Sequence, residues 1–234
     1  MALAVTAAVA LPRLSGAAPV ENPDLAGAAS QSPAASIAPS PSAQVESCVP
    51  RPGIWEESMR RQMQQMDDVL LGAIPSGVRT GQHDCGFGRP YDGAPITSVE
   101  DVTEVYVDEH VGTIAMYRIR DTSPRPTGDL CATSPRKRMP PAMGIDALNG
   151  VETSCQVLAA KGATVRIGTM RQPAPGTTGQ TVVVRHATRY IEGWLILVAE
   201  LPYAFSSVGP PLLATPIFTT AQLAELAANP GLLP

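Results

Sequence analysis

The sequence predicts an α+β domain: an antiparallel sheet of about six strands, covered by an N-terminal amphipathic helix and a short C-terminal helix. Three observations support this class. A long amphipathic segment comes first, three pairs of β-rich segments follow, and a short helix with clear start signals closes the chain. The 234 residues are 44% hydrophobic, which is enough for one ordinary core. One folded domain is therefore expected.

The chain begins with an apolar segment that is too short to span a membrane. It has about half of the roughly 20 residues that a membrane-spanning helix needs, and no basic segment precedes it. We interpret residues 1–14 as the remnant of a signal peptide or membrane anchor that starts upstream. Residues 15–47 are rich in Pro, Ala and Ser without apolar periodicity, so they are predicted to be a disordered spacer. The folded domain is then residues 48–234.

The first element of this domain is an amphipathic helix within residues 54–74. Its apolar residues recur at spacings of three and four, namely Trp55, Met59, Met63, Met66, Leu70 and Ile74. Gly72 is a candidate C-terminal cap. Methionine side chains fill irregular gaps well, so we expect this apolar stripe to pack against the sheet.

Three hairpins are predicted to follow the helix. They join residues 99–107 to 111–119, residues 153–160 to 164–170 through Lys161 and Gly162, and residues 181–191 to 194–201 through Glu192 and Gly193. Residues 81–95 are rich in turn formers and are predicted to be a loop.

The C-terminal helix is predicted from its start signals. Thr219 and Gln222 have the spacing of a capping box, and Phe218 and Leu223 occupy the two positions of a hydrophobic staple. Pro230 ends the helix, because the residue before a proline disfavours helical geometry. A helix of two turns is not stable alone, so it is expected to pack on the sheet as a lid.

Charge and composition disfavour several kinds of partner. The formal net charge is -4, and the basic residues are scattered, so no basic stripe could neutralise a run of phosphates. Only 4% of the residues are aromatic, which leaves few platforms for stacking on bases or sugars. Binding to nucleic acid is therefore not expected.

Four cysteines occur, all beyond the predicted export segment: Cys48, Cys85, Cys131 and Cys155. An even number in an exported chain indicates two disulfides, with three possible connectivities. We favour the pairs Cys48–Cys85 and Cys131–Cys155.

The densest group of reactive side chains is His83, Asp84 and Cys85. One alternative function is a secreted hydrolase with a site near His83 and Asp84. A metal site could also combine His83 and Cys85 with Cys131 and Cys155, but these spacings match no compact zinc pattern. We predict no catalytic residue, no metal site and no cofactor. The sequence also lacks a Gly-x-Ser-x-Gly elbow, a His-Glu-x-x-His motif and a phosphate loop.

A basic run lies in the loop that a Cys131–Cys155 disulfide would close: Arg136, Lys137, Arg138 and Met139. The simpler interpretation is a solvated loop, and the sharper one is a contact loop for a partner, since exposed loops often carry function. A secreted inhibitor that acts through Arg136 to Met139 is a second alternative function. His186 is expected in mid-strand, on the solvent side.

At its C-terminal end the chain resembles a group of uncharacterised exported or membrane-tethered proteins of high-GC Gram-positive bacteria, which end on a segment like LTxxQLxxLAxDPxL. The matching residues are Thr219, Gln222, Leu223, Leu226, Ala227, Pro230 and Leu232, and the stretch "DCGF" at residues 84–87 also fits. Asn229, where Asp is common, and the long loop between Cys131 and Cys155 are departures. The resemblance implies an extracytoplasmic, non-catalytic domain, sometimes found beside envelope-stress signalling proteins.

The sequence and the resemblance together favour a non-enzymatic domain that binds or senses an unidentified protein or ligand at the cell envelope. We expect the chain to be extracytoplasmic, either secreted or anchored to the cytoplasmic membrane by its N-terminus.

Overall fold

The computed structural model describes residues 57–88, 97–135, 148–175, 178–191, 193–205 and 212–233. These residues all belong to one compact unit, Pro41–Pro234. Several predictions fall outside the described residues: the anchor remnant 1–14, the spacer 15–47, Cys48, Trp55 and the basic run Arg136 to Met139.

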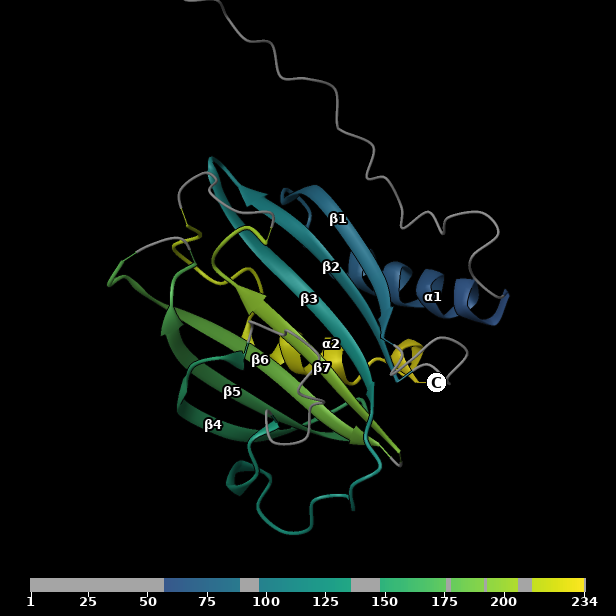
Figure 1. Ribbon diagram of the computed structural model, residues 1–234. Coiled ribbons are helices and arrows are strands. Elements are labelled where there is room, and N and C mark those ends of the chain that lie inside the picture. Colours follow the sequence, from purple (N-terminus) through teal and green to yellow (C-terminus); the bar gives the residue numbers. More distant parts are fainter. Residues whose placement is uncertain are drawn as a thin grey trace, which may run out of the picture. The chain divides into compact units, whose positions relative to one another are not determined.

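The described strands form one antiparallel sheet of seven strands in the order β1-β2-β3-β7-β6-β5-β4 (Figure 1). In chain order the strands are β1 (Arg79–Gly88), β2 (Ser98–Val107), β3 (His110–Arg120), β4 (Val151–Ala160), β5 (Ala163–Pro173), β6 (Thr181–Ile191) and β7 (Trp194–Leu201). Two meanders, β1 to β3 and β4 to β7, meet where β3 pairs with β7. The α+β class, the antiparallel sheet and the three hairpins are confirmed.

The predicted count of six strands is wrong, because β1 runs through residues that were predicted to be a loop. Glycines gave β1 the composition of a turn, but here they make room for side chains of β2. A Cβ atom at Gly81 would collide with the ring of Tyr106, and one at Gly86 would lie 2.7 Å from Glu100 Oε1. At these two positions of β1, glycine leaves room for side chains of the neighbouring strand.

The predicted hairpin turn at Lys161 and Gly162 has the backbone that its sequence indicates. Lys161 and Gly162 both have positive φ angles, 46° and 75°, which a two-residue turn of type I′ requires. Gly193 also has a positive φ angle of 73°, at the turn between β6 and β7. These turns fix the register of both hairpins.

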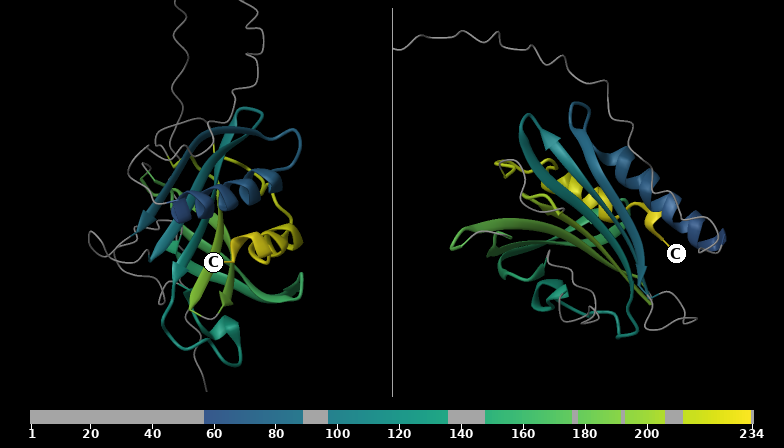
Figure 2. Two further views of the ribbon diagram at one scale, coloured as in Figure 1. Left: turned by 90° about the vertical axis from the view of Figure 1, so that its right-hand side faces the viewer. Right: turned by 45° about the horizontal axis from the view of Figure 1, so that its top comes forward.

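The two α-helices among the described residues are α1 (Glu57–Ala73) and α2 (Thr220–Ala227), and they lie on the same side of the sheet (Figure 2). We call this side the helix face. Their placement differs from a lid over the whole sheet: α1 contacts mainly β2, whereas α2 contacts β4 to β7. Seven strands about 4.8 Å apart are roughly three times as wide as a helix of about 10 Å, so each helix covers only part of the face.

The apolar core of the helix face combines both helices with the sheet. Met63, Met66 and Leu70 of α1 are at most 1% exposed, so these members of the predicted stripe pack inward. The side chain of Met59 lies outside the described residues. The predicted capping box of Thr219 and Gln222 is present at the start of α2. Phe218 and Leu223, the predicted staple residues, are both buried in the same core. Neither of the described helices is long and apolar enough to cross a membrane.

A second core lies on the opposite side, which we call the loop face because no described helix of more than one turn covers it. It includes Tyr117, Leu148 and Tyr203, and Leu130 packs against it from η1 (Leu130–Ala132). A disulfide between Cys131 and Cys155, with the two Cα atoms 5.7 Å apart, joins this loop to β4 and confirms the predicted pair.

The other predicted disulfide stays a prediction. Cys85 is a disulfide-bonded cysteine, but its expected partner Cys48 lies outside the described residues.

Candidate functional site

A pocket of about 350 Å³ opens where β6 begins and β7 ends. It forms because the segment from Leu212 to Phe218 passes around this end of the sheet, from the loop face to the helix face. The backbone N–H of Leu213 donates to the carbonyl groups of Val111 and Pro202, which fixes the segment at the end of the sheet. Apolar walls come from residues such as Val183 and Pro216.

A buried ion pair also lines this pocket. Glu200 is only 4% exposed, and its Oε1 atom accepts the backbone N–H groups of Ile217 and Phe218. Its Oε2 atom lies 3.4 Å from Nη1 of Arg185. Burial raises the pKa of the Glu200 carboxyl, while the two N–H groups and Arg185 act in the opposite direction.

Arg185 connects this ion pair to the start of α2. Its Nη1 atom donates to the carbonyl of Phe218 at 2.8 Å, and its Nη2 atom lies 3.4 Å from Oγ1 of Thr220. The charged lining of the pocket is therefore held in place by the backbone before α2.

The described lining of this pocket combines apolar residues with one ion pair. It contains no His, Cys, Ser or Lys residue. Glu200 and Arg185 are its described charged groups, and both are already engaged with each other and with backbone groups. A small molecule with an apolar body and a polar end matches such a lining.

The structure separates His83 from Asp84, which the sequence had placed together. The His83 side chain points under α1 and is 1% exposed, whereas Asp84 is exposed and accepts the N–H of Cys85. Residues next to each other in a strand point to opposite faces, which accounts for the separation.

His83 instead lies between two aspartates that sequence reasoning missed. Its Nε2 atom is 2.6 Å from Asp101 Oδ1 and 3.6 Å from Asp67 Oδ1. Burial raises the pKa of Asp101, and the hydrogen bond to His83 lowers it. A signal was present: Asp67 interrupts the apolar stripe of α1, four residues after Met63, where a buried polar residue needs a reason.

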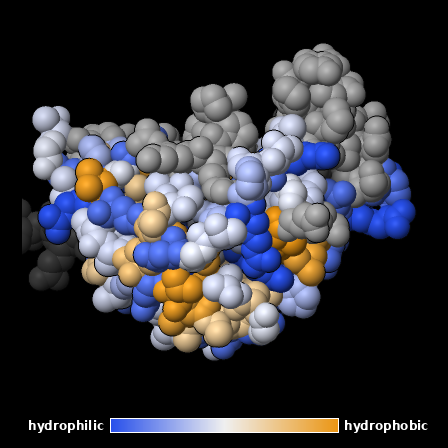
Figure 3. Space-filling view, turned by 90° about the horizontal axis from the view of Figure 1, so that it is seen from below, coloured by the Kyte–Doolittle hydropathy of each residue, from blue (hydrophilic) through white to orange (hydrophobic). Residues whose placement is uncertain are grey.

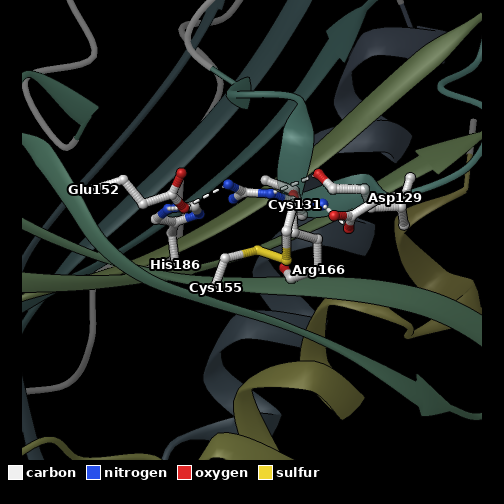
Figure 4. Close-up of a disulfide and its surroundings, with 8 residues drawn as sticks. Asp129, Cys131, Glu152, Cys155, Arg166 and His186 are labelled. Atoms are coloured by element: carbon white, nitrogen blue, oxygen red, sulfur yellow. Dashed lines mark hydrogen bonds and ion pairs between the residues drawn. A yellow bond between two sulfur atoms is a disulfide. The ribbon is translucent and has the colours of Figure 1, made fainter.

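A second buried polar cluster lies on the loop face (Figure 4). Arg166 is fully buried, with Nη2 2.5 Å from Glu152 Oε1 and Nε donating to the carbonyl of Leu130 at 3.0 Å. Figure 4 shows Glu152 and His186 together at the guanidinium, close to the Cys131–Cys155 disulfide. The cluster thus links β4, β5 and β6 to the loop that covers them.

The expectation that His186 faces solvent is wrong, because the loop face is covered. His186 is 0% exposed, and burial together with the charge of Arg166 lowers its pKa to about 3. Glu152 Oε1 lies 3.8 Å from Nε2 of His186 and would favour the protonated ring. That carboxylate is already bound by Arg166 at a shorter distance, so burial dominates and His186 is neutral.

The metal site considered from the sequence, made of His83, Cys85, Cys131 and Cys155, is not assembled. Cys131 and Cys155 are bonded to each other on the loop face, whereas His83 lies under α1 on the helix face. The sheet separates the two groups.

No protein-family model, curated protein or solved structure matches the chain. Its function is therefore inferred from the geometry of the sites described above.

Proposed function

We propose that this chain is a non-enzymatic, extracytoplasmic domain that binds or senses a small amphipathic molecule at the cell envelope. One observation carries the proposal: the pocket of about 350 Å³ at the end of β6 and β7, with apolar walls and the fixed pair of Arg185 and Glu200. Its size lies within the range of about 300 to 1,000 Å³ that is usual for small-molecule sites.

Two further features support a location outside the cytoplasm. Disulfides persist mainly in oxidising compartments, and the Cys131–Cys155 bond closes the loop face. The apolar residues 1–14 and the resemblance to exported or tethered proteins point the same way.

The hydrolase alternative receives no support from the described residues. His83 is buried under α1 and Asp84 points to the other face, so the two do not meet in a cleft. The inhibitor alternative depends on Arg136 to Met139, which lie outside the described residues.

Exposed apolar residues outside the pocket offer control positions for a test of binding in the pocket. Figure 3 views the molecule from below, the side of β4 in Figure 1, and shows small apolar patches among hydrophilic residues. Val151 and Val157 of β4 are exposed apolar residues that do not line the pocket, whereas Val183 of β6 lines it.

The proposal is tested with a probe that has an apolar body and a charged end, the fluorescent dye anilinonaphthalene sulfonate. We expect saturable binding of one dye per chain. Val183→Trp fills the pocket and should weaken binding at least about tenfold, or about 1.4 kcal/mol. Val151→Trp is the matched control, because Val151 is an exposed valine in a strand outside the pocket. Equal binding by both variants would show that the pocket is not the site.

The extracytoplasmic part is tested separately by non-reducing peptide mapping of the protein from its native source. A Cys131–Cys155 peptide pair is expected. Free thiols at both positions would contradict an oxidising location.

A further inference from the structure

Three buried side chains from three different elements converge beneath α1. Asp67 comes from α1, His83 from β1 and Asp101 from β2, and one ligand atom of each lies within 4.8 Å of the others. Their side chains are 2%, 1% and 0% exposed. We infer that these residues form a binding site for one divalent transition-metal ion, with Zn²⁺ as the best match.

The distances between the ligand atoms suit a single ion. Two ligands of a tetrahedral Zn²⁺ ion, each about 2.1 Å from the metal, lie roughly 3.4 Å apart. His83 Nε2 and Asp67 Oδ1 are already 3.6 Å apart. The hydrogen bond of 2.6 Å between His83 and Asp101 would have to lengthen by less than about 1 Å, a shift within reach of a small carboxylate rotation.

The chemistry of the three groups favours a transition metal over Ca²⁺ or Mg²⁺. Calcium and magnesium prefer ligand sets made of oxygen, whereas an imidazole nitrogen suits zinc and its neighbours. Two carboxylates and one neutral imidazole also balance the charge of a divalent ion. Such balance matters at a site that is almost fully removed from water.

Unsatisfied polar atoms give a second indication of a ligand. Oδ2 of Asp101 is buried and has no hydrogen-bond partner among the described residues. Oγ1 of Thr103 is in the same state, and Thr103 pairs directly with His83 across β1 and β2. Buried polar atoms in native proteins nearly always have a partner, and an ion bound by Asp101 would supply one.

The rigidity of the frame also suits a metal site. All three ligands are on a helix or on paired strands, which hold side chains more precisely than loops do. The site lies at β1 and β2, whereas the pocket lies at β6 and β7, so it goes beyond the proposed function and is tested independently of it.

The test measures zinc binding to the full chain after treatment with a chelator, by equilibrium dialysis against ZnCl₂. We expect one zinc ion per chain, and tetrahedral absorption bands in the visible range when CoCl₂ replaces zinc. Asp101→Asn and Asp67→Asn should each lower the zinc affinity by at least about 100-fold, since changes even around metal ligands cost about 10- to 100-fold. Asp84→Asn is the matched control, because Asp84 is exposed beside His83.

Circular dichroism shows whether each variant folds. Should the Asn variants unfold, X-ray absorption of the zinc-loaded wild-type chain replaces them, with one imidazole and otherwise oxygen ligands expected. The inference is overturned if the wild-type chain binds no zinc, if folded Asp101→Asn and Asp67→Asn bind it as tightly as the control, or if sulfur ligates the metal.

Discussion

On both faces of the sheet, arginine side chains hold the segments that pack over the strands, but these segments differ in structure. On the helix face, Arg185 binds the carbonyl of Phe218 just before α2, and Arg189 binds the carbonyl of Ala228 just after it. The helix supplies its own backbone hydrogen bonds and an apolar side, so the arginines only fix its two ends.

On the loop face the cover is mostly irregular and is held in another way. Arg166 binds the carbonyl of Leu130, and the Cys131–Cys155 disulfide ties the same turn to β4. An irregular segment gains little from its own hydrogen bonds, so it is ordered by a buried charge and a covalent bond. The comparison teaches that a helix over the sheet is held mainly by packing. An irregular segment over the sheet needs specific interactions, here a buried arginine and a disulfide.

The largest expected effect comes from Arg166, the anchor of the loop face. Arg166→Met leaves Glu152 without its buried partner and should lower the free energy of unfolding by about 4 kcal/mol, measured by urea denaturation. Arg171→Met, an exposed position on the same strand, should change it by less than about 0.5 kcal/mol. The double variant Arg166→Met with Glu152→Gln should recover part of the loss. A loss below 1 kcal/mol for Arg166→Met would mean that this anchor is not needed.

Removal of the disulfide should have the next largest effect. Replacing Cys131 and Cys155 by Ala opens a loop with a sequence separation of 24, which should cost about 3 kcal/mol on the chain-entropy account. Hydrogen exchange should increase first at the amides of residues 129–133, while the amides of α2 stay protected. If α2 loses protection to the same degree, the two covers are not independent and the comparison fails.

The buried titratable groups of the two faces should also affect the pH dependence of stability in opposite directions. The pKa of His186 is about 3 in the fold and about 6.5 when unfolded, so the unfolded chain binds more protons between these values. Stability should therefore fall as pH decreases from 6.5 towards 3, by up to about 1.4 kcal/mol per pH unit from this group. The raised pKa of Glu200 on the helix face has the opposite sign: its contribution is lost as pH rises.

Comparison of wild type with His186→Gln isolates the histidine. The variant should lose less stability on going from pH 6.5 to pH 5, by about 1.6 kcal/mol. His110→Gln, at the first residue of β3, serves as the control for the loss of an imidazole. Identical slopes for wild type and His186→Gln would show that His186 is not buried in neutral form.

Features with local causes could be predicted from the sequence. The turn at Lys161 and Gly162 and the capping box of Thr219 and Gln222 depend on residues within three positions of each other, and the structure contains both. The buried side of α1 followed from its spacing. Only the Cys131–Cys155 pair was predicted across a longer distance, and it was favoured among three connectivities.

Features with distant causes were missed. The sequence of β1 looks like a loop because it contains glycines. Two of them lie close to the side chains of Tyr106 and Glu100 on the next strand. The environment of His186 depends on Glu152 and Arg166 from neighbouring strands. The meeting of Asp67 with His83 depends on where α1 crosses the sheet. The periodicity of a single sequence can place Asp67 on the buried side of α1, but it does not identify the distant residues that it meets.

The smallest expected effect concerns the start of α2 on the helix face. Thr219→Ala removes the acceptor for the N–H of Gln222 and should lower the free energy of unfolding by about 1 kcal/mol. Thr122→Ala, at an exposed loop position, should stay within about 0.5 kcal/mol of wild type. Because Arg185 and Arg189 still hold both ends of the helix, α2 should fray without leaving the sheet. Hydrogen exchange would then increase only in the first turn of α2, whereas increased exchange along the whole helix would mean that packing alone does not hold this cover.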